Sequence, residues 1–395
     1  MPKLTVRDLR ELKGTRIFVR VDYNVPIERG AIDDDTRIRA SLPTLDHLLR
    51  GGARLVLASH LGRPKKGPAP EFSLAPVAAR LAELLGRGVA MAPDCVGPDV
   101  QRQAGALPEG GILLLENVRF HKEEEANDPA FAARLIADSG ATVFVNDAFG
   151  SAHRAHASTE GVSHHVKVSV AGLLMEKELR YLGMALEAPE RPFVAVLGGA
   201  KVSDKIQVIE ALLPRVDALL IGGGMAYTFF RAQGQATGKS LVEEDKVALA
   251  KDLLGHARGK IRLPLDHVVA AAFKEDAEHK TLPAAEVPEG WMGLDVGPRT
   301  AAAFGEEIRR AKLVLWNGPM GVFEMKPFSQ GTLAVARAMA DCQGTTIVGG
   351  GDSVAAVTHM GLSDKIDHVS TGGGASLEFL AGDPLPGVAC LQDKS

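Results

Sequence analysis

The stretch PFVAVLGGAKVSDKIQVIEALL, residues 192–213, contains a strand, a glycine turn and a helix in succession. Residues 193–197 are an apolar run of β-forming side chains between a proline and a glycine, which predicts a buried strand. From Ser203, the expected N-cap, apolar residues recur at helical spacing up to Leu213. We interpret the rest of the chain as an arrangement around this strand, turn and helix.

The turn between this strand and helix, Gly198-Gly199-Ala200-Lys201, has the features of a phosphate site. Its two glycines allow a ligand to approach the backbone closely, and Lys201 and Lys205 place positive charge beside a helix N-terminus. The expected ligand is therefore an anion, and phosphate fits best. The alternative is an ordinary strand-to-helix connection with surface lysines.

Length and composition predict a soluble protein of two domains. A chain of 395 residues is too long for one typical core, so two domains of roughly 150–200 residues are expected. A content of 46% hydrophobic and 24% charged residues is ordinary for a globular protein. A net charge of -4 gives no overall attraction to nucleic acid or to an anionic membrane, so neither is an expected partner.

The cysteines and the N-terminus bear on the cellular compartment. Cys95, Cys342 and Cys390 form no CxxC pair, so neither a disulfide framework nor a structural zinc site is expected. The first residues, MPKLTVRDLR, contain no apolar signal region, and no window approaches the ~18 apolar residues of a membrane span. We therefore expect a cytoplasmic protein.

The first half alternates strands with helices, which predicts a parallel sheet. The expected strands are residues 16–21, 54–58, 112–115 and 142–145, and the expected helices are residues 41–50, 73–85 and 129–138. Polar and basic residues follow each strand, and the carboxyl ends of parallel strands share one edge where ligands bind. The basic residues expected at this edge are Arg20, His60, Arg63, Arg119, His153 and Arg154, with Arg37 nearby.

These basic residues predict an anion site in the first half. Several guanidinium groups converging on one crevice suit a small, highly charged carboxylate or phosphate ligand. A solvated surface charge is the simpler interpretation of any single arginine, but recurrence after successive strands favours a shared site. His60 and His153 are interpreted as anion donors, because no cysteine or histidine partner sits at metal-ligand spacing.

The second half repeats the alternation after a connecting helix expected over residues 172–188. Strands are expected near residues 193, 218, 268, 312 and 345, and helices near residues 205, 227, 243, 303, 331 and 355. Glycine-rich turns again follow strands, and the most informative is GGGDS, residues 349–353. Here Ser353 is the expected helix cap, and Asp352 supplies a hard oxygen for magnesium or, alternatively, a second acidic cap.

Three familiar nucleotide-binding signatures are missing. GQATGKS, residues 234–240, has three residues between its glycines, whereas a Walker A motif needs four. No GxGxxG fingerprint occurs, because Tyr227 and Val354 stand where a third glycine is required. The HRD and DFG signatures of protein kinases are also missing.

The chain resembles the phosphoglycerate kinase family over essentially its whole length. The motifs that carry the resemblance are RVDYNVP at 20–26, SHLGRP at 59–64, ENVRF at 116–120, NDAFGSAHRAHAS at 146–158, LGGAKVSDK at 197–205, WMGLDVGP at 291–298, WNGPMGVFE at 316–324, GGGDS at 349–353 and STGGGASLE at 370–378. Tyr23 and Ser353 stand where the family also uses Phe and Thr.

The resemblance implies a phosphotransferase with a carboxyl group as acceptor. The implied reaction is reversible transfer of a phosphoryl group from 1,3-bisphosphoglycerate to Mg-ADP, giving 3-phosphoglycerate and ATP in glycolysis and gluconeogenesis, by direct in-line transfer with hinge closure. The implied phosphoglycerate-binding residues are Asp22, Tyr23, Asn24, Arg37, His60, Leu61, Gly62, Arg63, Arg119 and Arg154. The implied nucleotide-binding residues are Lys201, Lys205, Gly293, Glu324, Gly350, Gly351, Asp352 and Ser353, with Asp352 as the magnesium ligand. The implied catalytic residues are Arg37, Lys201, Gly351 and Gly373.

The implied fold class is α/β, with two similar lobes that are each a doubly wound, mainly parallel sheet with helices on both faces. The implied domains are residues 1–170, onto which residues 383–395 pack back, an interdomain helix at 171–188, and a nucleotide-binding domain at 189–382. A monomer is expected. An acyl phosphate and ADP react through oxygens that are already ionised, so no general base is needed and catalysis consists of positioning and electrostatic stabilisation.

Two other classes of protein would share a two-lobed α/β architecture. A dehydrogenase is disfavoured because the dinucleotide fingerprint is missing, and a lack of NAD binding would exclude it. A solute-binding protein should carry an export signal, and it has no use for a second glycine-rich phosphate loop.

Overall fold

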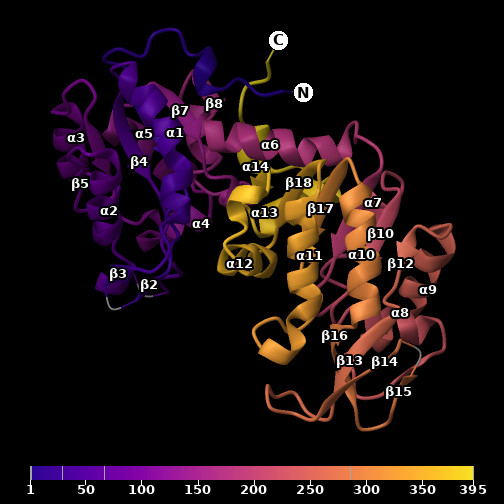
Figure 1. Ribbon diagram of the computed structural model, residues 1–395. Coiled ribbons are helices and arrows are strands. Elements are labelled where there is room, and N and C mark those ends of the chain that lie inside the picture. The colour runs from indigo at the N-terminus through magenta and orange to yellow at the C-terminus, as the bar shows by residue number, and fades with distance from the viewer. Residues whose placement is uncertain (1, 29, 66, 285, 395) are drawn as a thin grey trace. The chain divides into compact units, whose positions relative to one another are not determined.

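The computed structural model describes residues 2–28, 30–65, 67–284 and 286–394. Met1 and Ser395, which belong to the expected first domain, lie outside the described residues. The chain divides into two compact units: unit 1 comprises Met1–Leu179 with Pro384–Ser395, and unit 2 comprises Arg180–Asp383. Each unit is built on one six-stranded sheet (Figure 1). Among the described residues, no helix is both long and apolar enough to cross a bilayer.

The sheet of unit 1 is parallel and has the strand order β5-β6-β4-β1-β7-β8. Its strands are β1 (Arg16–Arg20), β4 (Arg54–Ala58), β5 (Ala90–Met91), β6 (Ile112–Leu114), β7 (Val143–Asn146) and β8 (Val168–Ala171). The four predicted strands are therefore confirmed to within a residue or two at their ends. The order reverses at β1, where Arg20 lies opposite both Ala58 and Asn146, so the carboxyl ends of three strands are level.

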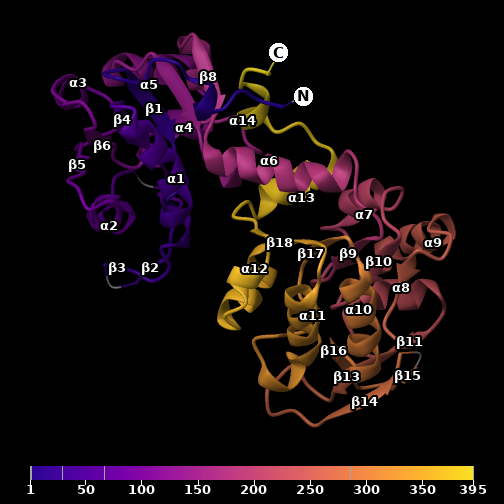
Figure 2. The same cartoon turned by 45° about the horizontal axis from the view of Figure 1, so that its top comes forward.

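Helices cover this sheet on both faces (Figures 1 and 2). They are α1 (Thr36–Arg50), α2 (Ala75–Leu85), α3 (Pro98–Gly105), α4 (Lys122–Glu125), α5 (Pro129–Ser139) and the short α14 (Pro386–Ala389). Helix α1 begins before the predicted residue 41 because Asp34 accepts a hydrogen bond from the Thr36 N–H (2.8 Å), in a polar segment without apolar periodicity. Alternate residues of β1 and β4, such as Ile17 and Leu55, share one apolar core with Leu45 of α1 and Leu81 of α2.

The sheet of unit 2 is also parallel, with the order β12-β10-β9-β17-β18-β19. Its strands are β9 (Phe193–Leu197), β10 (Ala218–Ile221), β12 (Ile261–Arg262), β17 (Leu313–Asn317), β18 (Thr345–Gly349) and β19 (His368–Val369). Strand β9 has the predicted bounds. The strand order reverses between β9 and β17, and Leu197 lies opposite Asn317, so the glycine turns that follow these strands start at the same level.

The described residues of unit 2 also form α-helices that flank its strands. They are α7 (Ile206–Leu212), α8 (Ala226–Ala232), α9 (Val247–His256), α10 (Pro298–Arg310), α11 (Gln330–Asp341), α12 (Gly351–His359) and α13 (Gly374–Ala381). Helices α10 and α11 lie side by side (Figures 1 and 2). Helix α6 (Leu173–Leu186), predicted as a connector, contributes residues to both units.

The strand predicted near residue 268 does not join the parallel sheet. It is β13 (Asp266–Ala270), which pairs antiparallel with β14 (His279–Pro283) and β16 (Met292–Val296). An apolar run gives no information about its pairing direction, which is why the sequence did not reveal this separate sheet. Two short pairs complete the strands, β2 (Ile27–Glu28) with β3 (Ala31–Ile32) and β11 (Ala236–Thr237) with β15 (Glu286–Val287).

Two predicted helix caps are wrong. Ser203 does not cap α7, which begins at Ile206; its backbone N–H and hydroxyl donate instead to the Glu243 carboxylate, at 3.0 and 2.5 Å. Ser353 lies inside α12, where its Oγ accepts a hydrogen bond from the Gly318 N–H at 2.6 Å. Both hydroxyls are taken by partners distant in sequence, which local capping rules cannot anticipate.

The C-terminal segment is attached to unit 1 through β7. The Asn146 Nδ2 donates to the Gly387 carbonyl (2.8 Å), and the Gly387 N–H donates to the Ala152 carbonyl (2.9 Å). The Asn146 Oδ1 accepts a hydrogen bond from the Ala148 N–H (3.1 Å). Because Asn146 is fully buried, these bonds have no water to replace them.

We predict that Asn146→Ala lowers the free energy of unfolding by about 1–3 kcal/mol, because it leaves a buried carbonyl and a buried N–H without partners. Chemical denaturation followed by circular dichroism measures this change. Gln392→Ala is the control, since Gln392 is exposed and bonds the backbone of Lys167 and Ser169 at 3.2 and 3.4 Å. Equal losses in the two variants would contradict the assignment.

Candidate active site

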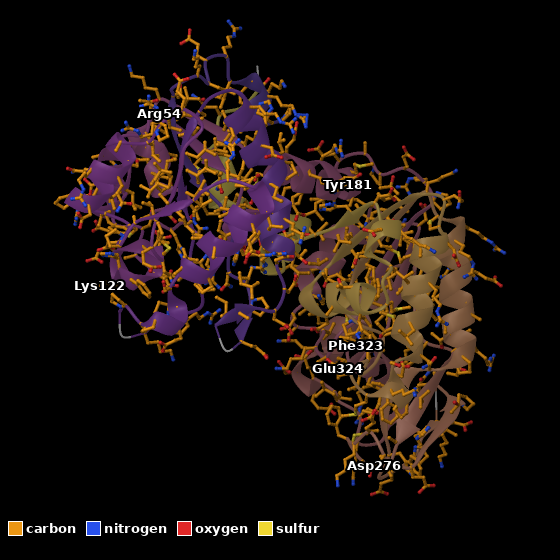
Figure 3. All side chains as sticks on the ribbon, turned by 60° about the vertical axis from the view of Figure 1, so that its left-hand side comes forward. Arg54, Lys122, Tyr181, Asp276, Phe323 and Glu324 are labelled. Carbon is orange, nitrogen blue, oxygen red and sulfur yellow. The ribbon has the colours of Figure 1, made fainter. Side chains whose placement is uncertain are left out.

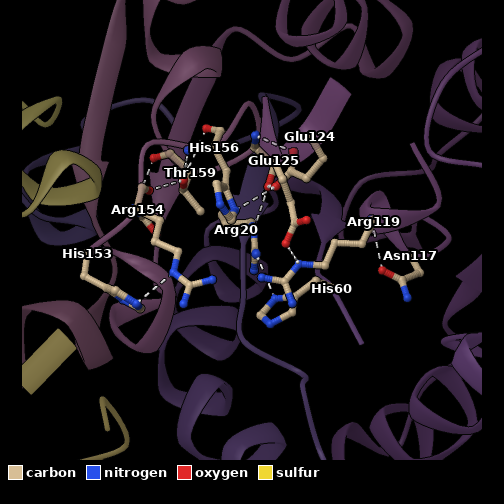
Figure 4. A network of polar contacts seen from close by, with 12 residues as sticks. Arg20, His60, Asn117, Arg119, Glu124, Glu125, His153, Arg154, His156 and Thr159 are labelled. Atoms are coloured by element: carbon tan, nitrogen blue, oxygen red, sulfur yellow. Dashed lines mark hydrogen bonds and ion pairs between the residues drawn. The ribbon is translucent and has the colours of Figure 1, made fainter. Parts of the chain in front are cut away.

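A buried guanidinium group lies at the carboxyl end of β1. Arg20 is 1% exposed; its Nε donates to Ser158 Oγ at 2.8 Å, and one of its terminal nitrogens lies 3.0 Å from His60 Nδ1 (Figure 4). Ser158 in turn donates its N–H and hydroxyl to the buried carboxylate of Glu124, at 2.9 and 2.5 Å. Arg20 was expected at the ligand edge, but its contacts make it a support for His60.

His60 is positioned as a neutral hydrogen-bond donor. Burial, together with the positive charges of Arg20, Arg119 and Arg37, holds the pKa of His60 well below its usual range. A guanidinium group can only donate, so Nδ1 of His60 accepts from Arg20 and the imidazole proton resides on Nε2. That N–H can donate to an anion without adding a charge.

Arg119 is held on a short 3-10 helix, η3 (Val118–Phe120), which Asn117 caps by accepting the Arg119 N–H (3.1 Å). One guanidinium nitrogen of Arg119 donates to the Gly62 carbonyl at 2.9 Å, and its Nε lies 3.2 Å from Glu125 Oε1. The side chain is 10% exposed. These contacts fix the direction of the guanidinium plane before any ligand arrives.

The turns that follow β1 and β4 are hydrogen-bonded to each other. Arg37 lies 3.2 Å from both carboxylate oxygens of Asp22 and 3.3 Å from the Asn24 carbonyl. Asn24 Oδ1 accepts the Gly62 N–H at 2.8 Å. Two loops that are distant in sequence are thereby brought into one surface.

The remaining predicted residues of unit 1 differ in what they present. The phenol of Tyr23 is fully buried and lies 2.9 Å from Ser41 Oγ, and Leu61 is 4% exposed, so only their main chains are available to a ligand. Arg63 and Arg154 are exposed, and Arg154 Nε donates to His153 at 3.1 Å (Figure 4).

The sequence analysis missed the acid behind these arginines. Glu124 belongs to the run KEEE, which has the appearance of a solvated surface segment, yet it is fully buried. Burial raises the pKa of Glu124, against the opposing effects of Arg20 and the Ser158 hydrogen bonds. The neighbouring His156 is 7% exposed, and burial with the nearby arginines lowers its pKa to about 4. No local pattern distinguishes Glu124 from its acidic neighbours.

In unit 2, three glycine turns pack main chain against main chain. A Cβ on Gly198 would lie 2.1 Å from the Pro319 carbonyl, one on Gly318 would lie 2.3 Å from the Gly198 carbonyl, and one on Gly223 would lie 2.6 Å from Gly199 N. Backbone hydrogen bonds join the same turns, including Gly199 N–H to the Pro319 carbonyl at 2.9 Å. Gly198, Gly223 and Gly318 therefore serve turn packing, a role that the sequence analysis had not separated from ligand approach.

Other glycines do face open space. A Cβ added to Gly199 or Gly351 would meet no atom within 4 Å. Gly351 is the first residue of α12, so the first N–H groups of that helix have no partner within the helix. A helix N-terminus with open space before it suits an anion.

A buried lysine and a buried amide lie beside the same helix. Lys205, 9% exposed, donates from Nζ to Asn317 Oδ1, and burial lowers the pKa of Lys205 to about 8, opposed by Asp204 and Asp352. The Nδ2 of Asn317 is buried without a hydrogen-bond partner among the described residues. Gly350, with φ of 87°, passes close to this amide, since a Cβ there would lie 3.0 Å from Nδ2. An unsatisfied donor, an ammonium group and a helix N-terminus therefore adjoin one another.

The other predicted residues of unit 2 lie on its loops. Gly293 lies against Tyr227, whose Oη would be 1.5 Å from an added Cβ, so only glycine leaves the ring its space. Glu324 follows β17 and is exposed (Figure 3). Lys201 is exposed, Asp352 is exposed in the first turn of α12, and Gly373 occupies the N-cap position of α13 with φ of 49°.

Comparisons with known proteins identify the family of the chain. A family model described as phosphoglycerate kinase matches residues 6–383. The chain is 60% identical to the phosphoglycerate kinase of Moorella thermoacetica, over 100% of both chains, and 59% identical to the cytosolic phosphoglycerate kinase of Triticum aestivum, over 97% of this chain and 96% of the relative. The solved phosphoglycerate kinase from Coxiella burnetii superposes with a TM-score of 0.89 at 42% identity, covering 98% of both chains. That from Pyrococcus horikoshii gives 0.86 at 33%, with the same coverage.

We predict that Gly198→Ala lowers the free energy of unfolding by about 1–3 kcal/mol or more, because its new Cβ meets rigid backbone. Gly351→Ala should leave stability unchanged, since nothing lies within 4 Å and alanine is a good helix former. Thermal unfolding of the two variants measures the difference. A stable Gly198→Ala protein would show that the close turn packing is not needed.

Proposed function

This chain belongs to the phosphoglycerate kinase family, and we propose that its two units divide the reaction, unit 1 binding the triose and unit 2 the magnesium nucleotide. The chain catalyses reversible phosphoryl transfer between 1,3-bisphosphoglycerate and ADP, giving 3-phosphoglycerate and ATP in glycolysis. It is a phosphotransferase with a carboxyl group as acceptor. We propose which residues bind the triose, which bind the nucleotide and which contact the phosphoryl group during transfer.

For the triose, the proposed contacts are the neutral N–H of His60, the main chain around Asp22–Asn24 and Leu61–Gly62, and the guanidinium groups of unit 1. The arginines concerned are Arg37, Arg63, Arg119 and Arg154. The observation that carries this assignment is that contacts within the protein orient both donors: Arg20 positions His60, and the Gly62 carbonyl and Glu125 position Arg119. Donors fixed in advance lose little freedom when an anion binds.

For the nucleotide, we propose that the phosphates lie against the α12 N-terminus, Lys205 and the turn at Gly350–Ser353. The unsatisfied Asn317 amide supports this assignment, because a phosphate oxygen is the kind of acceptor it lacks. Glu324 and Gly293 are proposed to contact the nucleoside. Asp352 fits magnesium, since it is an exposed carboxylate beside the proposed phosphate position. Magnesium held there would neutralise part of the phosphate charge.

The chemistry then requires no proton acceptor. The reacting oxygens of the triose and the nucleotide are ionised, so the protein contributes alignment and stabilisation of the charge on the moving phosphoryl group. We propose that Arg37 and Lys201 contact this group, with the N-termini at Gly351 and Gly373 directed toward it. Direct in-line transfer with hinge closure, a monomeric state and a cytoplasmic location complete the proposal.

A coupled assay that follows ATP formation from ADP and 1,3-bisphosphoglycerate tests the function. We expect turnover that depends on magnesium and shows no NAD requirement. Absence of ATP formation by the folded protein would overturn the proposal.

We predict that Arg119→Ala weakens 3-phosphoglycerate binding by about 10–100-fold, the loss expected for a charge-assisted hydrogen bond, while Mg-ADP affinity stays unchanged. Asp352→Ala should weaken Mg-ADP and reduce the magnesium dependence of binding, with the triose unaffected. Titration calorimetry with each ligand measures both affinities.

Matched controls exist for both variants. Arg102, which pairs with Asp99 on the surface of unit 1, and Asp364, on an exposed turn of unit 2, should tolerate alanine without loss of either ligand. Losses of equal size for both ligands in Arg119→Ala and Asp352→Ala would refute the division between the units.

We predict that Mg-ADP affinity falls as the pH rises above about 8, where Lys205 loses its charge. Bound phosphate stabilises the charged amine and raises its pKa, so binding takes up a proton at high pH and weakens by at most about tenfold per pH unit. Calorimetry between pH 7 and 9 tests this, with Lys205→Met expected to bind weakly and with a flatter profile. An unchanged affinity for the native protein across this range would exclude contact between Lys205 and the phosphates.

A further inference from the structure

Three side chains that the proposed function does not use converge near the edge of the unit 1 sheet. A carboxylate oxygen of Asp94, the Sγ of Cys95 and a ring nitrogen of His121 all lie within 4.8 Å of one another. His121 Nε2 is 2.7 Å from Asp94 Oδ1. Asp94 and Cys95 are adjacent, whereas His121 comes from a separate strand connection.

The sheet itself brings these residues together. Strands β5 and β6 pair in parallel, with Met91 opposite Leu114, and the connections that follow them carry Asp94 with Cys95 and His121 respectively. The Glu116 N–H donates to the Asp94 carbonyl at 3.4 Å, which joins the two connections. The His121 ring stacks on Phe131 of α5, with centroids 5.1 Å apart. Contacts other than the cluster itself therefore hold both connections in place.

The donor set has the composition of a site for a borderline-soft cation. Magnesium and calcium prefer oxygen ligands, whereas a thiolate, an imidazole and a carboxylate together suit Zn²⁺. At the usual Zn²⁺ bond lengths, neighbouring tetrahedral ligands lie about 3.5 Å apart. Shifts of about 1 Å therefore suffice: inward for the more distant atoms, and apart for His121 Nε2 and Asp94 Oδ1, which lie 2.7 Å from each other. Asp94 and His121 can make such shifts, because their side chains are 48% and 27% exposed.

The same exposure provides an entry path, while Cys95 forms the buried floor of the cluster. Without a cation, His121 Nε2 donates its proton to Asp94 Oδ1. A cation would displace the thiol proton, which passes to solvent, while neutral His121 would bind the cation through Nε2 and carry its own proton on Nδ1.

We propose that Asp94, Cys95 and His121 form a binding site for a zinc-class divalent cation, with a water molecule as the fourth ligand. The site is separate from the magnesium position proposed at Asp352, which lies in the other unit. On binding, the cation forms bonds to the Cys95 sulfur, the His121 nitrogen and an Asp94 oxygen, and the thiol proton is released to solvent.

The test uses the full-length protein, stripped of metal with a chelator in phosphate-free buffer, and Co²⁺ as the spectroscopic probe. We expect one equivalent of Co²⁺ to produce a thiolate-to-cobalt charge-transfer band in the near ultraviolet, which Zn²⁺ abolishes and a large excess of Mg²⁺ does not. Calorimetry in buffers of different ionisation enthalpy should show proton release as Zn²⁺ binds. Failure of the native protein to produce the band would overturn the proposal.

The variants identify the ligands. Cys95→Ser should abolish the band. His121→Phe retains a ring for stacking on Phe131 and should weaken Zn²⁺ binding by at least about tenfold. Loss of a hydrogen-bond partner of a metal ligand already weakens binding by that much, so loss of a ligand should not weaken it less. Cys342→Ser and His164→Ala are the controls, and neither substitution should change the band or Zn²⁺ binding. His164 is exposed and pairs with Glu160 at 2.5 Å, outside the proposed site. A band that persists unchanged in both Cys95→Ser and His121→Phe would refute the assignment.

Discussion

Parallel strand pairing at the reversal of strand order is the constraint on which the rest of each unit depends. In unit 1 it sets Arg20 level with Ala58 and Asn146, and in unit 2 it sets Leu197 level with Asn317. Each following turn therefore starts at the same height, although the turns are far apart in sequence. Helix N-termini then project toward the same edge, where the orphan N–H groups of their first turns meet anions. Two sheets with different side chains at this edge can therefore each hold a charged ligand.

The proposed anion site of unit 1 is built on buried charged groups. Arg20 and Glu124 are both nearly inaccessible, so each needs partners within the protein in place of water. Ser158 lies between them and satisfies both groups. The arrangement keeps His60 neutral and oriented, so the ligand meets an N–H donor held by a buried cation. In unit 2 main chain dominates the corresponding edge: the turns at Gly198, Gly223 and Gly318 pack directly on one another, and Gly351 faces open space.

Much of this arrangement could be predicted from local sequence, because strands such as β9 and the basic residues after each strand produce periodic or recurrent patterns. What could not be predicted depends on partners distant in the chain. Ser203 is engaged by Glu243 and Ser353 by Gly318, so neither hydroxyl caps a helix. The burial of Glu124 and the antiparallel pairing of β13 likewise leave no local signal. Cys95 and His121 are too far apart in sequence for any metal-ligand spacing rule, and only the β5–β6 pairing makes them neighbours.

The pKa values of the buried groups are consistent with a proposed site that aligns its ligands and stabilises charge without transferring protons. Burial lowers the pKa of His156 to about 4 and that of Lys205 to about 8, and it holds the pKa of His60 well below its usual range. At pH values well between 4 and 8, His60 and His156 therefore stay neutral and Lys205 stays charged. Arginines stay charged throughout. Two buried carboxyl groups do take up protons in this interval, since burial raises the pKa of Asp147 to about 6 and that of Asp295 to about 7. A carboxyl with a raised folded-state pKa stabilises the fold when protonated, and that stabilisation is lost as the pH rises through the folded pKa. Moderate changes of pH therefore act on stability, while the charge presented to phosphates stays constant, as a reaction without a general base allows.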